Sequence, residues 1–174
     1  EATIDWDESA TVVLPEESAE KADMLIASDA AYARKRVTIQ AEKGAKKSLF
    51  QTLRTAGKLH VQTELTAEDG AEIELIQLVA PGENALVYDE VIGHCHGSGR
   101  IVLRQVTLGH GDVYAQTGIG LDGENASFAA NIGYLARKNQ TLDMNLVVNH
   151  WGKKTKCEIN ASGALNDAAK KIFR

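Results

Sequence analysis

The sequence predicts a mainly β protein with one short helix near its N-terminus. Short stretches rich in β-branched residues recur along much of its 174 residues, and polar or glycine-bearing corners separate them. Only 5% of the residues are aromatic, so a core must be built mainly from Val, Ile, Leu and Ala. Hydrophobic residues make up 44% and charged residues 25%, which is typical of one globular domain with a sizeable core.

The first 36 residues are expected to be a helical or irregular segment ahead of the β core. Residues 11–13 are β-branched and favour one edge strand. Pro15 and the two acids after it fit a first helical turn, where proline is tolerated and the helix dipole favours negative charge. Apolar residues then recur near helical spacing to about Ala33, which predicts a helix. Residues 37–39 indicate a strand and residues 41–44 a turn.

From Leu59 onward, strand-like segments begin at regular intervals. They start near Leu59, Glu72, Leu86, Arg100, Asp112, Ala126, Gln140 and Thr155. Successive starts lie 12 to 15 residues apart, with corners such as 68–70, 81–84, 97–99, 109–111 and 122–125 between them. This spacing fits an antiparallel meander or sandwich. It fits equally a two-faced solenoid in which each coil of about 27 residues gives one strand to each sheet.

Alternation within the segments predicts which side chains form the core. In residues 112–121 the odd positions are apolar or small, whereas the even positions are polar or glycine. In residues 100–108 both faces carry apolar groups. The residues predicted to be buried are Val102, Val106, Val113, Ile119, Ile132, Leu142 and Leu146.

Charge and cysteine content argue against several classes of protein. The net charge is −5 and no basic stripe is present, so nucleic acid is not expected as a partner. No apolar run approaches the ~20 residues that span a bilayer, and residues 1–17 lack the pattern of a secretory leader. Cys95 and Cys157 give no disulfide framework and no Cys-x-x-Cys pair. A cytoplasmic location is expected.

The most suggestive local cluster is His94-Cys95-His96. In a strand the two imidazoles would project to one face while the Cys95 thiol points to the other. Two histidines at this spacing can share a metal ion, but two further ligands must come from elsewhere. The three residues are therefore weak candidate metal ligands. The alternative is a corner with solvated histidines beside Gly93 and Gly97.

No catalytic or cofactor-binding residue is predicted. His60 is expected on a half-exposed strand face, and His110 and His150 at corners. The acid pairs Asp89/Glu90 and Asp122/Glu124 are expected to be solvated. No nucleophile elbow, phosphate-binding loop or dinucleotide fingerprint is present. The residues alone leave an enzyme and a binding module equally open.

The C-terminal half resembles the SufB/SufD family, scaffold proteins of iron–sulfur cluster assembly, with a SufD-like core segment. Residues 99–109 and 120–126 resemble its glycine-bearing corners. The most specific segment is the tail, where His150 is followed by four residues, Thr155, one residue, and Cys157 in place of the usual Ser. Residues 163–165 and 168–173 continue the pattern. The match covers residues 72–173 well and residues 37–71 loosely.

The resemblance implies a right-handed parallel β-helix over residues 37–174 after the short N-terminal helix, which favours the solenoid. It also implies a non-catalytic scaffold that pairs with a SufB/SufD-type partner, or with itself as a homodimer, and with the ATPase SufC. The residues that assemble the nascent cluster and the helices that dock on SufC are expected beyond Arg174, so the core would be truncated at its C-terminal end. Membrane and nucleic acid are not among the implied partners.

Cys95 and Cys157 are not expected to hold an iron–sulfur cluster stably. Such a cluster usually needs about four thiolates, and the two cysteines should lie on different coils, ~10 Å or more apart. A transient cluster at a subunit interface is compatible with the family. Two other functions stand as alternatives: a β-helix carbohydrate-active enzyme, such as a polysaccharide lyase or hydrolase, and a purely structural β-solenoid adaptor.

Overall fold

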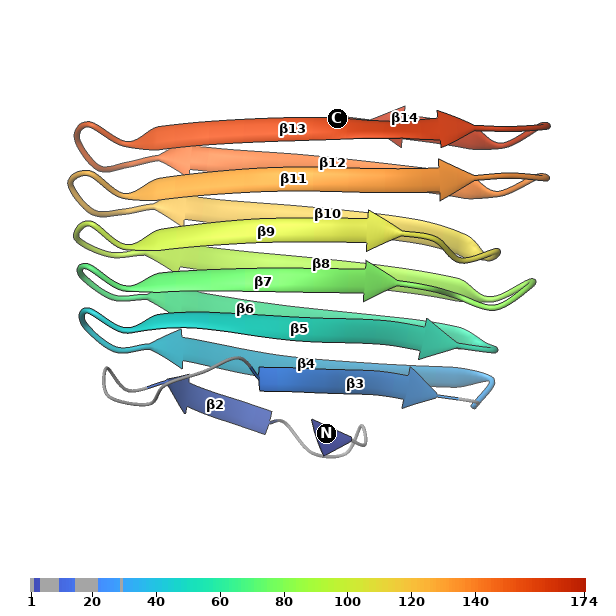
Figure 1. Cartoon of the computed structure of the whole chain (residues 1–174), viewed down its shortest axis with the longest axis horizontal. Helices are drawn as coiled ribbons and strands as arrows, with labels where there is room; N and C mark the ends of the chain where they lie inside the picture. Colours follow the sequence, from blue (N-terminus) through green and yellow to red (C-terminus); the bar gives the residue numbers. More distant parts are fainter. Residues whose placement is uncertain (1, 4–9, 15–21, 29) are drawn as a thin grey trace.

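The chain folds into a two-sheet β-solenoid. A computed structural model describes residues 2–3, 10–14, 22–28 and 30–174, with side chains from residue 22 onward. The odd-numbered strands form one seven-stranded sheet, sheet A, and the even-numbered strands form a second one, sheet B. The chain crosses from one sheet to the other at every corner, so each pair of consecutive strands makes one coil (Figure 1).

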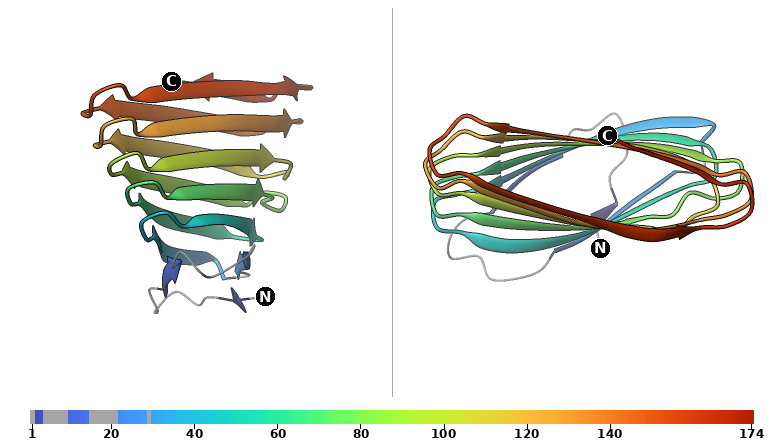
Figure 2. Two further views of the ribbon diagram at one scale, coloured as in Figure 1. Left: turned by 60° about the vertical axis from the view of Figure 1, so that its left-hand side comes forward. Right: turned by 90° about the horizontal axis from the view of Figure 1, so that it is seen from above.

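All neighbouring strands pair in parallel. Sheet A contains β1 (Ala2–Thr3), β3 (Ala22–Ser28), β5 (Lys46–Thr55), β7 (Glu72–Val79), β9 (Arg100–Thr107), β11 (Ser127–Ala136) and β13 (Lys156–Leu165). Sheet B contains β2 (Ala10–Leu14), β4 (Tyr32–Ala41), β6 (Lys58–Ala67), β8 (Leu86–Cys95), β10 (Asp112–Leu121), β12 (Thr141–His150) and β14 (Lys170–Phe173). Seen from above, the coils superpose as a flattened ring, and the chain turns in the right-handed sense as it rises (Figure 2).

The structure decides between the two architectures that the spacing allowed. The parallel pairing excludes an antiparallel meander for the described strands and confirms the solenoid. From β6 to β13, each strand begins within one residue of its predicted start. The predicted corners lie between strands, because polar residues and glycine satisfy the tight bends that close each coil.

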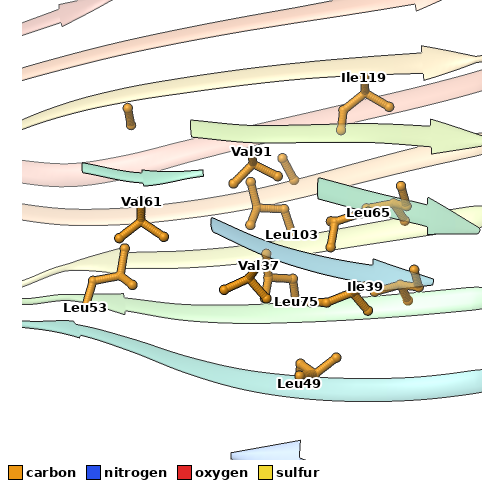
Figure 3. Packing of buried hydrophobic residues seen from close by; sticks show 14 of the residues in the cluster. Val37, Ile39, Leu49, Leu53, Val61, Leu65, Leu75, Val91, Leu103 and Ile119 are labelled. Atoms are coloured by element: carbon orange, nitrogen blue, oxygen red, sulfur yellow. The ribbon is translucent and has the colours of Figure 1, made fainter. Parts of the chain in front are cut away.

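The core lies between the two sheets. Successive residues of a strand point alternately inward and outward, and the register repeats this alternation in every coil. Inward residues such as Leu75, Leu103 and Ile119 are almost completely buried, and residues from both sheets interdigitate there (Figure 3). The five odd positions of β10 are buried as predicted. At about 25 cal/mol per Å² of apolar surface removed from water, this burial is the main term that stabilises the coils.

Glycine is required at one column of corners. Gly44, Gly70 and Gly97 adopt positive φ angles of 77°, 71° and 54°. At Gly123 a Cβ atom would lie 2.0 Å from the backbone nitrogen of Gly97, and at Gly152 it would lie 2.0 Å from the carbonyl oxygen of Gly123. At Gly123 and Gly152 the corner backbones therefore stack so closely that a side chain does not fit.

The helix predicted from Pro15 to about Ala33 is wrong where the structure describes it. Residues 15–21 and 29 lie outside the described residues, but Ala22–Ser28 is strand β3 and β4 begins at Tyr32. Met24 and Ile26 are buried and two residues apart, so the same apolar residues also satisfy a strand. Parallel pairing of β3 with β5 overrides the local helical spacing. The predicted edge strand at residues 11–13 is confirmed as part of β2.

Two core predictions also need correction. Val102, Val113, Ile119, Ile132 and Leu142 are buried as predicted. The predicted burial of Val106 is wrong, because 38% of this residue is exposed on the outer face. Leu146 is only partly buried. The inner face of β9 consists of Ile101, Leu103, Gln105 and Thr107, and its two polar residues conceal the inward pattern.

Candidate functional site

His94-Cys95-His96 lies at the end of β8, with its side chains on the predicted faces. Both histidines are exposed and Cys95 is buried. The two imidazole rings stack with their centroids 6.3 Å apart and an interplanar angle of 13°. His94 Nδ1 lies 2.9 Å from a carboxylate oxygen of Asp122.

This corner is not arranged as a metal site. Ring nitrogens donate to a metal in the plane of the ring, so parallel stacked imidazoles do not converge on one ion about 2 Å from each. One nitrogen of His94 is engaged with Asp122. Among the described residues, no group of three or more His, Cys, Asp or Glu is placed to hold a metal ion. The geometry matches the solvated corner that sequence analysis gave as the alternative.

The thiol of Cys95 is buried and not accessible to solvent. Its side chain packs in the core, and its Sγ lies 3.7 Å from the carbonyl oxygen of Ser127, to which it donates. Burial raises the pKa of the Cys95 thiol to about 12, so it stays protonated near neutral pH. A buried, protonated thiol is a poor nucleophile.

The tail motif has a structural basis at the corner after β12. His150 ends that strand, and its Nδ1 lies 2.7 Å from the hydroxyl oxygen of Thr155. This contact closes the corner and accounts for the spacing of four residues between them. Cys157 follows on β13 and is exposed, although partial burial also raises its pKa. The two cysteines lie on different sheets as well as on different coils.

Sequence analysis missed a ladder of polar side chains inside the solenoid. Gln51, Gln77 and Gln105 occupy one inward row on three successive strands of sheet A. The Nε2 of Gln105 donates to Oε1 of Gln77 at 2.9 Å, and the Nε2 of Gln77 donates to Oε1 of Gln51 at 2.7 Å. Gln51 in turn donates to Thr63 across the core at 3.2 Å. The amides thus satisfy one another away from water.

Asp89 faces this ladder from sheet B. Its Oδ1 accepts from Gln77 at 3.3 Å and its Oδ2 accepts from Gln105 at 2.8 Å. Only 1% of Asp89 is exposed. Burial raises the pKa of Asp89 to about 7, although the two amide hydrogen bonds oppose this change. Asp89 is therefore a buried group that binds or releases a proton near neutral pH.

The spacing of the ladder's glutamines in the sequence could have indicated it. Its glutamines are 26 and 28 residues apart, which is the length of one coil. Asp89 was expected to be solvated with Glu90, but neighbouring strand residues point to opposite faces. The two carboxylates consequently do not act as a pair. Asp122 and Glu124 are also separated in role, since Asp122 contacts His94 and Glu124 pairs with Lys154.

The last strands present an open surface. β13 and β14 lie at the ends of their sheets, and they expose Ile159, Leu165, Ile172 and Phe173. An open groove of about 760 Å³ runs beside the start of β13, and Arg100, Lys154, Lys156, Cys157 and Glu158 line it. The groove combines both charge signs with the thiol of Cys157, whose pKa partial burial raises.

Comparison with known proteins gives one family match. Residues 24–174 match the model of the SUF system FeS cluster assembly, SufBD core domain. No curated protein and no solved structure matches the chain significantly. Within the described residues, no helix is long and apolar enough to cross a membrane.

Proposed function

Because the chain belongs to the SufB/SufD family, we propose that it is a non-catalytic scaffold subunit of the SUF system, in which iron–sulfur clusters are assembled. The observation that carries the proposal is the match to the SufBD core domain over residues 24–174, which includes every strand from β4 to β14. The glutamine ladder supports a structural role, since its buried amides bond to one another and to Asp89.

The scaffold is proposed to pair with a SufB/SufD-type subunit, or with itself, and with the ATPase SufC in the cytoplasm. Support for pairing comes from membership of the SufB/SufD family, since the matched model is that of a core domain of the SUF system. The iron–sulfur cluster is proposed as transient cargo at a subunit interface, not as a group held by Cys95 or Cys157.

Affinity purification of the full-length protein from its own cells tests this function. We expect an ABC-type ATPase without membrane domains and a SufB/SufD-type subunit to co-purify in near-stoichiometric amounts. A Gly118→Ala variant should retain both, because a Cβ atom at Gly118 meets nothing within 4 Å. A Leu103→Asp variant should lose both, because it disrupts the core. Recovery of the wild-type protein with neither partner would contradict the proposal.

A further inference from the structure

The glutamine ladder inside the solenoid has a direction, because every bond along it runs the same way. Gln105 donates to Gln77 at 2.9 Å, and Gln77 donates to Gln51 at 2.7 Å. Gln51 in turn donates to the hydroxyl oxygen of Thr63 at 3.2 Å. Oε1 of Gln105 accepts no hydrogen bond from the described residues, so the ladder begins with an acceptor that is not used.

This direction suits an ionised Asp89. Both amide nitrogens beside the carboxyl group donate to it, Gln105 to Oδ2 at 2.8 Å and Gln77 to Oδ1 at 3.3 Å. An ionised carboxylate only accepts, so the two contacts satisfy it. A protonated carboxyl group also carries an O–H, which would face an N–H on either side. Its hydrogen would be buried without an acceptor.

The same side chains can form the ladder in the opposite direction. Rotation of a glutamine amide by about 180° exchanges its oxygen and nitrogen at nearly the same positions. When all three amides rotate, the Thr63 hydroxyl donates to Gln51, Gln51 to Gln77, and Gln77 to Gln105. Oε1 of Gln105 then lies where its nitrogen was and accepts the Oδ2–H of Asp89. Rotation of one amide alone would place two oxygens against each other, so the three must turn together.

We propose that proton binding to Asp89 reverses the direction of the whole ladder, which makes the ladder a proton-driven conformational switch inside the solenoid. The proton comes from solvent, and the O–H bond on Asp89 is the only covalent bond that forms. The reversed ladder leaves Nε2 of Gln105 without an acceptor, in place of the unused Oε1. Unpaired buried N–H groups are rarer than under-used carbonyl oxygens, so the ladder returns to its direction in the structure when the proton leaves.

One proton would change hydrogen bonds in three coils. Asp89 lies on β8, the three glutamines lie on β5, β7 and β9, and Thr63 lies on β6. Reversal therefore carries the effect of the proton from one strand of sheet B through sheet A to a second strand of sheet B. The switch rests on the interior alone and is independent of the proposed function.

The environment of Asp89 allows this titration near neutral pH. Burial raises the pKa of Asp89 to about 7 against the effect of the two amide bonds, and the negative charge of Glu90 also raises it. Glu90 points to the outer face of sheet B, where His60 lies 3.7 Å from its carboxylate. Glu90 is therefore a charged neighbour that can be removed without touching the interior.

Inside the solenoid, amides rather than a cation hold the carboxyl group. Register places Val61 on one side of Asp89 and Ala115 on the other. Lys35 lies in the same inward row, two strands from Asp89, or ~9.6 Å along the sheet. Val61 separates the two, so the polar groups that contact Asp89 are those of the facing glutamines.

Scalar couplings across hydrogen bonds, measured by NMR on the isotope-labelled 18.8 kDa chain, test the switch. Each coupling joins Nε2 of a donor amide to Cδ of its acceptor amide, so it reports which glutamine donates. Spectra are compared at about pH 9 and about pH 5, roughly two units on either side of the pKa of Asp89. Asp89→Asn replaces the switching group, and Glu90→Gln is the matched control, a carboxylate-to-amide change at the next residue, which points outward.

In the wild type we expect Gln105 to donate to Gln77 at the high pH and Gln77 to donate to Gln105 at the low pH. Asp89→Asn should show the low-pH direction at both values, because its amide supplies an N–H where the acid supplies an O–H. Glu90→Gln should still reverse, with a midpoint at lower pH, because a charge that raises the pKa of Asp89 is removed. The proposal is overturned if Gln105 donates to Gln77 at both pH values in the wild type, or if Asp89→Asn still reverses with pH.

Discussion

Two neighbouring rows inside sheet A are equally buried and chemically opposite. Leu49, Leu75 and Leu103 form one row, with exposures of 2%, 0% and 1%. Two residues further along the same strands, Gln51, Gln77 and Gln105 form the other row, with exposures of 1%, 1% and 2%. The leucine row is stabilised by removal of apolar surface from water. The glutamine row is tolerated because neighbouring amides bond along the stack, with Gln105 donating to Gln77 and Gln77 donating to Gln51.

Comparison of the two rows shows which kinds of residue can repeat in register inside the solenoid. A residue that can bond to its own copy one coil away can be repeated in the interior without an orphaned polar group. A carboxylate cannot, because it only accepts when ionised. Asp89 therefore depends on two glutamines of the opposite sheet. Some substitutions place a polar residue in the leucine row, and others place an apolar residue in the glutamine row. Their effects on the free energy of unfolding should differ by several kcal/mol.

The largest effect is expected from Leu103→Asp. This change places a carboxylate in the leucine row, where the facing side chains are apolar and offer no donor pair like that of Asp89. We expect the free energy of unfolding in urea to fall by about 5 kcal/mol. Leu103→Met, a volume-conserving change, should cost less than ~1.5 kcal/mol. Equal, small losses in both variants would show that the inner face of β9 is misassigned.

Gln77→Leu is expected to have the next largest effect. It removes the donor to Gln51 and Asp89 and the acceptor for Gln105. Leaving such buried groups unpaired should cost about 3 kcal/mol, only partly offset by the added apolar volume. In a double variant with Asp89→Leu, the loss should be smaller than the sum of the single losses, because the two residues interact. Simple additivity in urea unfolding would argue against the ladder.

Gly123→Ala tests the stacking that brings the rows into register. Its Cβ would lie 2.0 Å from the Gly97 backbone, so neighbouring corners must separate. We expect a loss of about 2 kcal/mol in thermal unfolding. Gly118→Ala is the control, since its Cβ meets no atom within 4 Å and alanine suits a strand better than glycine. Equal destabilisation by Gly118→Ala and Gly123→Ala would contradict the close stacking of the corners.

Val106→Asp should have the smallest effect on the monomer. Val106 is on the same strand as Leu103 but faces outward, where a carboxylate stays hydrated. At concentrations that keep the chain monomeric, the expected change in the free energy of unfolding is below about 1 kcal/mol. A loss close to that of Leu103→Asp would mean that this face is covered in the monomer.

The sequence predicted a strand and its buried face only where the inward-facing residues are apolar. Where they are apolar, as with Val113, Ile119 and Leu121 on β10, both the strand and its buried face were predicted. In β5 the inward positions include Lys47, Gln51 and Thr55, and no strand was predicted there. The alternation is present in β5, but it runs between buried and exposed residues rather than between apolar and polar ones.

The candidate site shows the same dependence. The opposed directions of Cys95 and the two histidines followed from strand geometry and are confirmed. The ladder was missed because a single glutamine or aspartate in a strand is normally solvated. Burial is indicated only because glutamine recurs once per coil of the chain. This recurrence can be interpreted only when the strands are known to stack in parallel.

The titration of Asp89 tests the central claim most directly, that in-register coils bury this carboxyl between two amides. Its pKa of about 7 in the folded state lies above the ordinary value of 3.8. The folded state thus binds the proton more tightly, and stability should fall as pH rises from about 4 through 7 and then level off. At ~1.4 kcal/mol per pH decade, the total loss is about 4 kcal/mol.

The measurement is the free energy of unfolding against pH, for the wild type and for Asp89→Asn. The difference between the two curves isolates Asp89, because other titrating groups are common to both proteins. We predict that this difference changes by several kcal/mol in favour of Asp89→Asn between pH 4 and pH 8. Parallel curves over this range would contradict the burial of Asp89 in the ladder and the register that places it there.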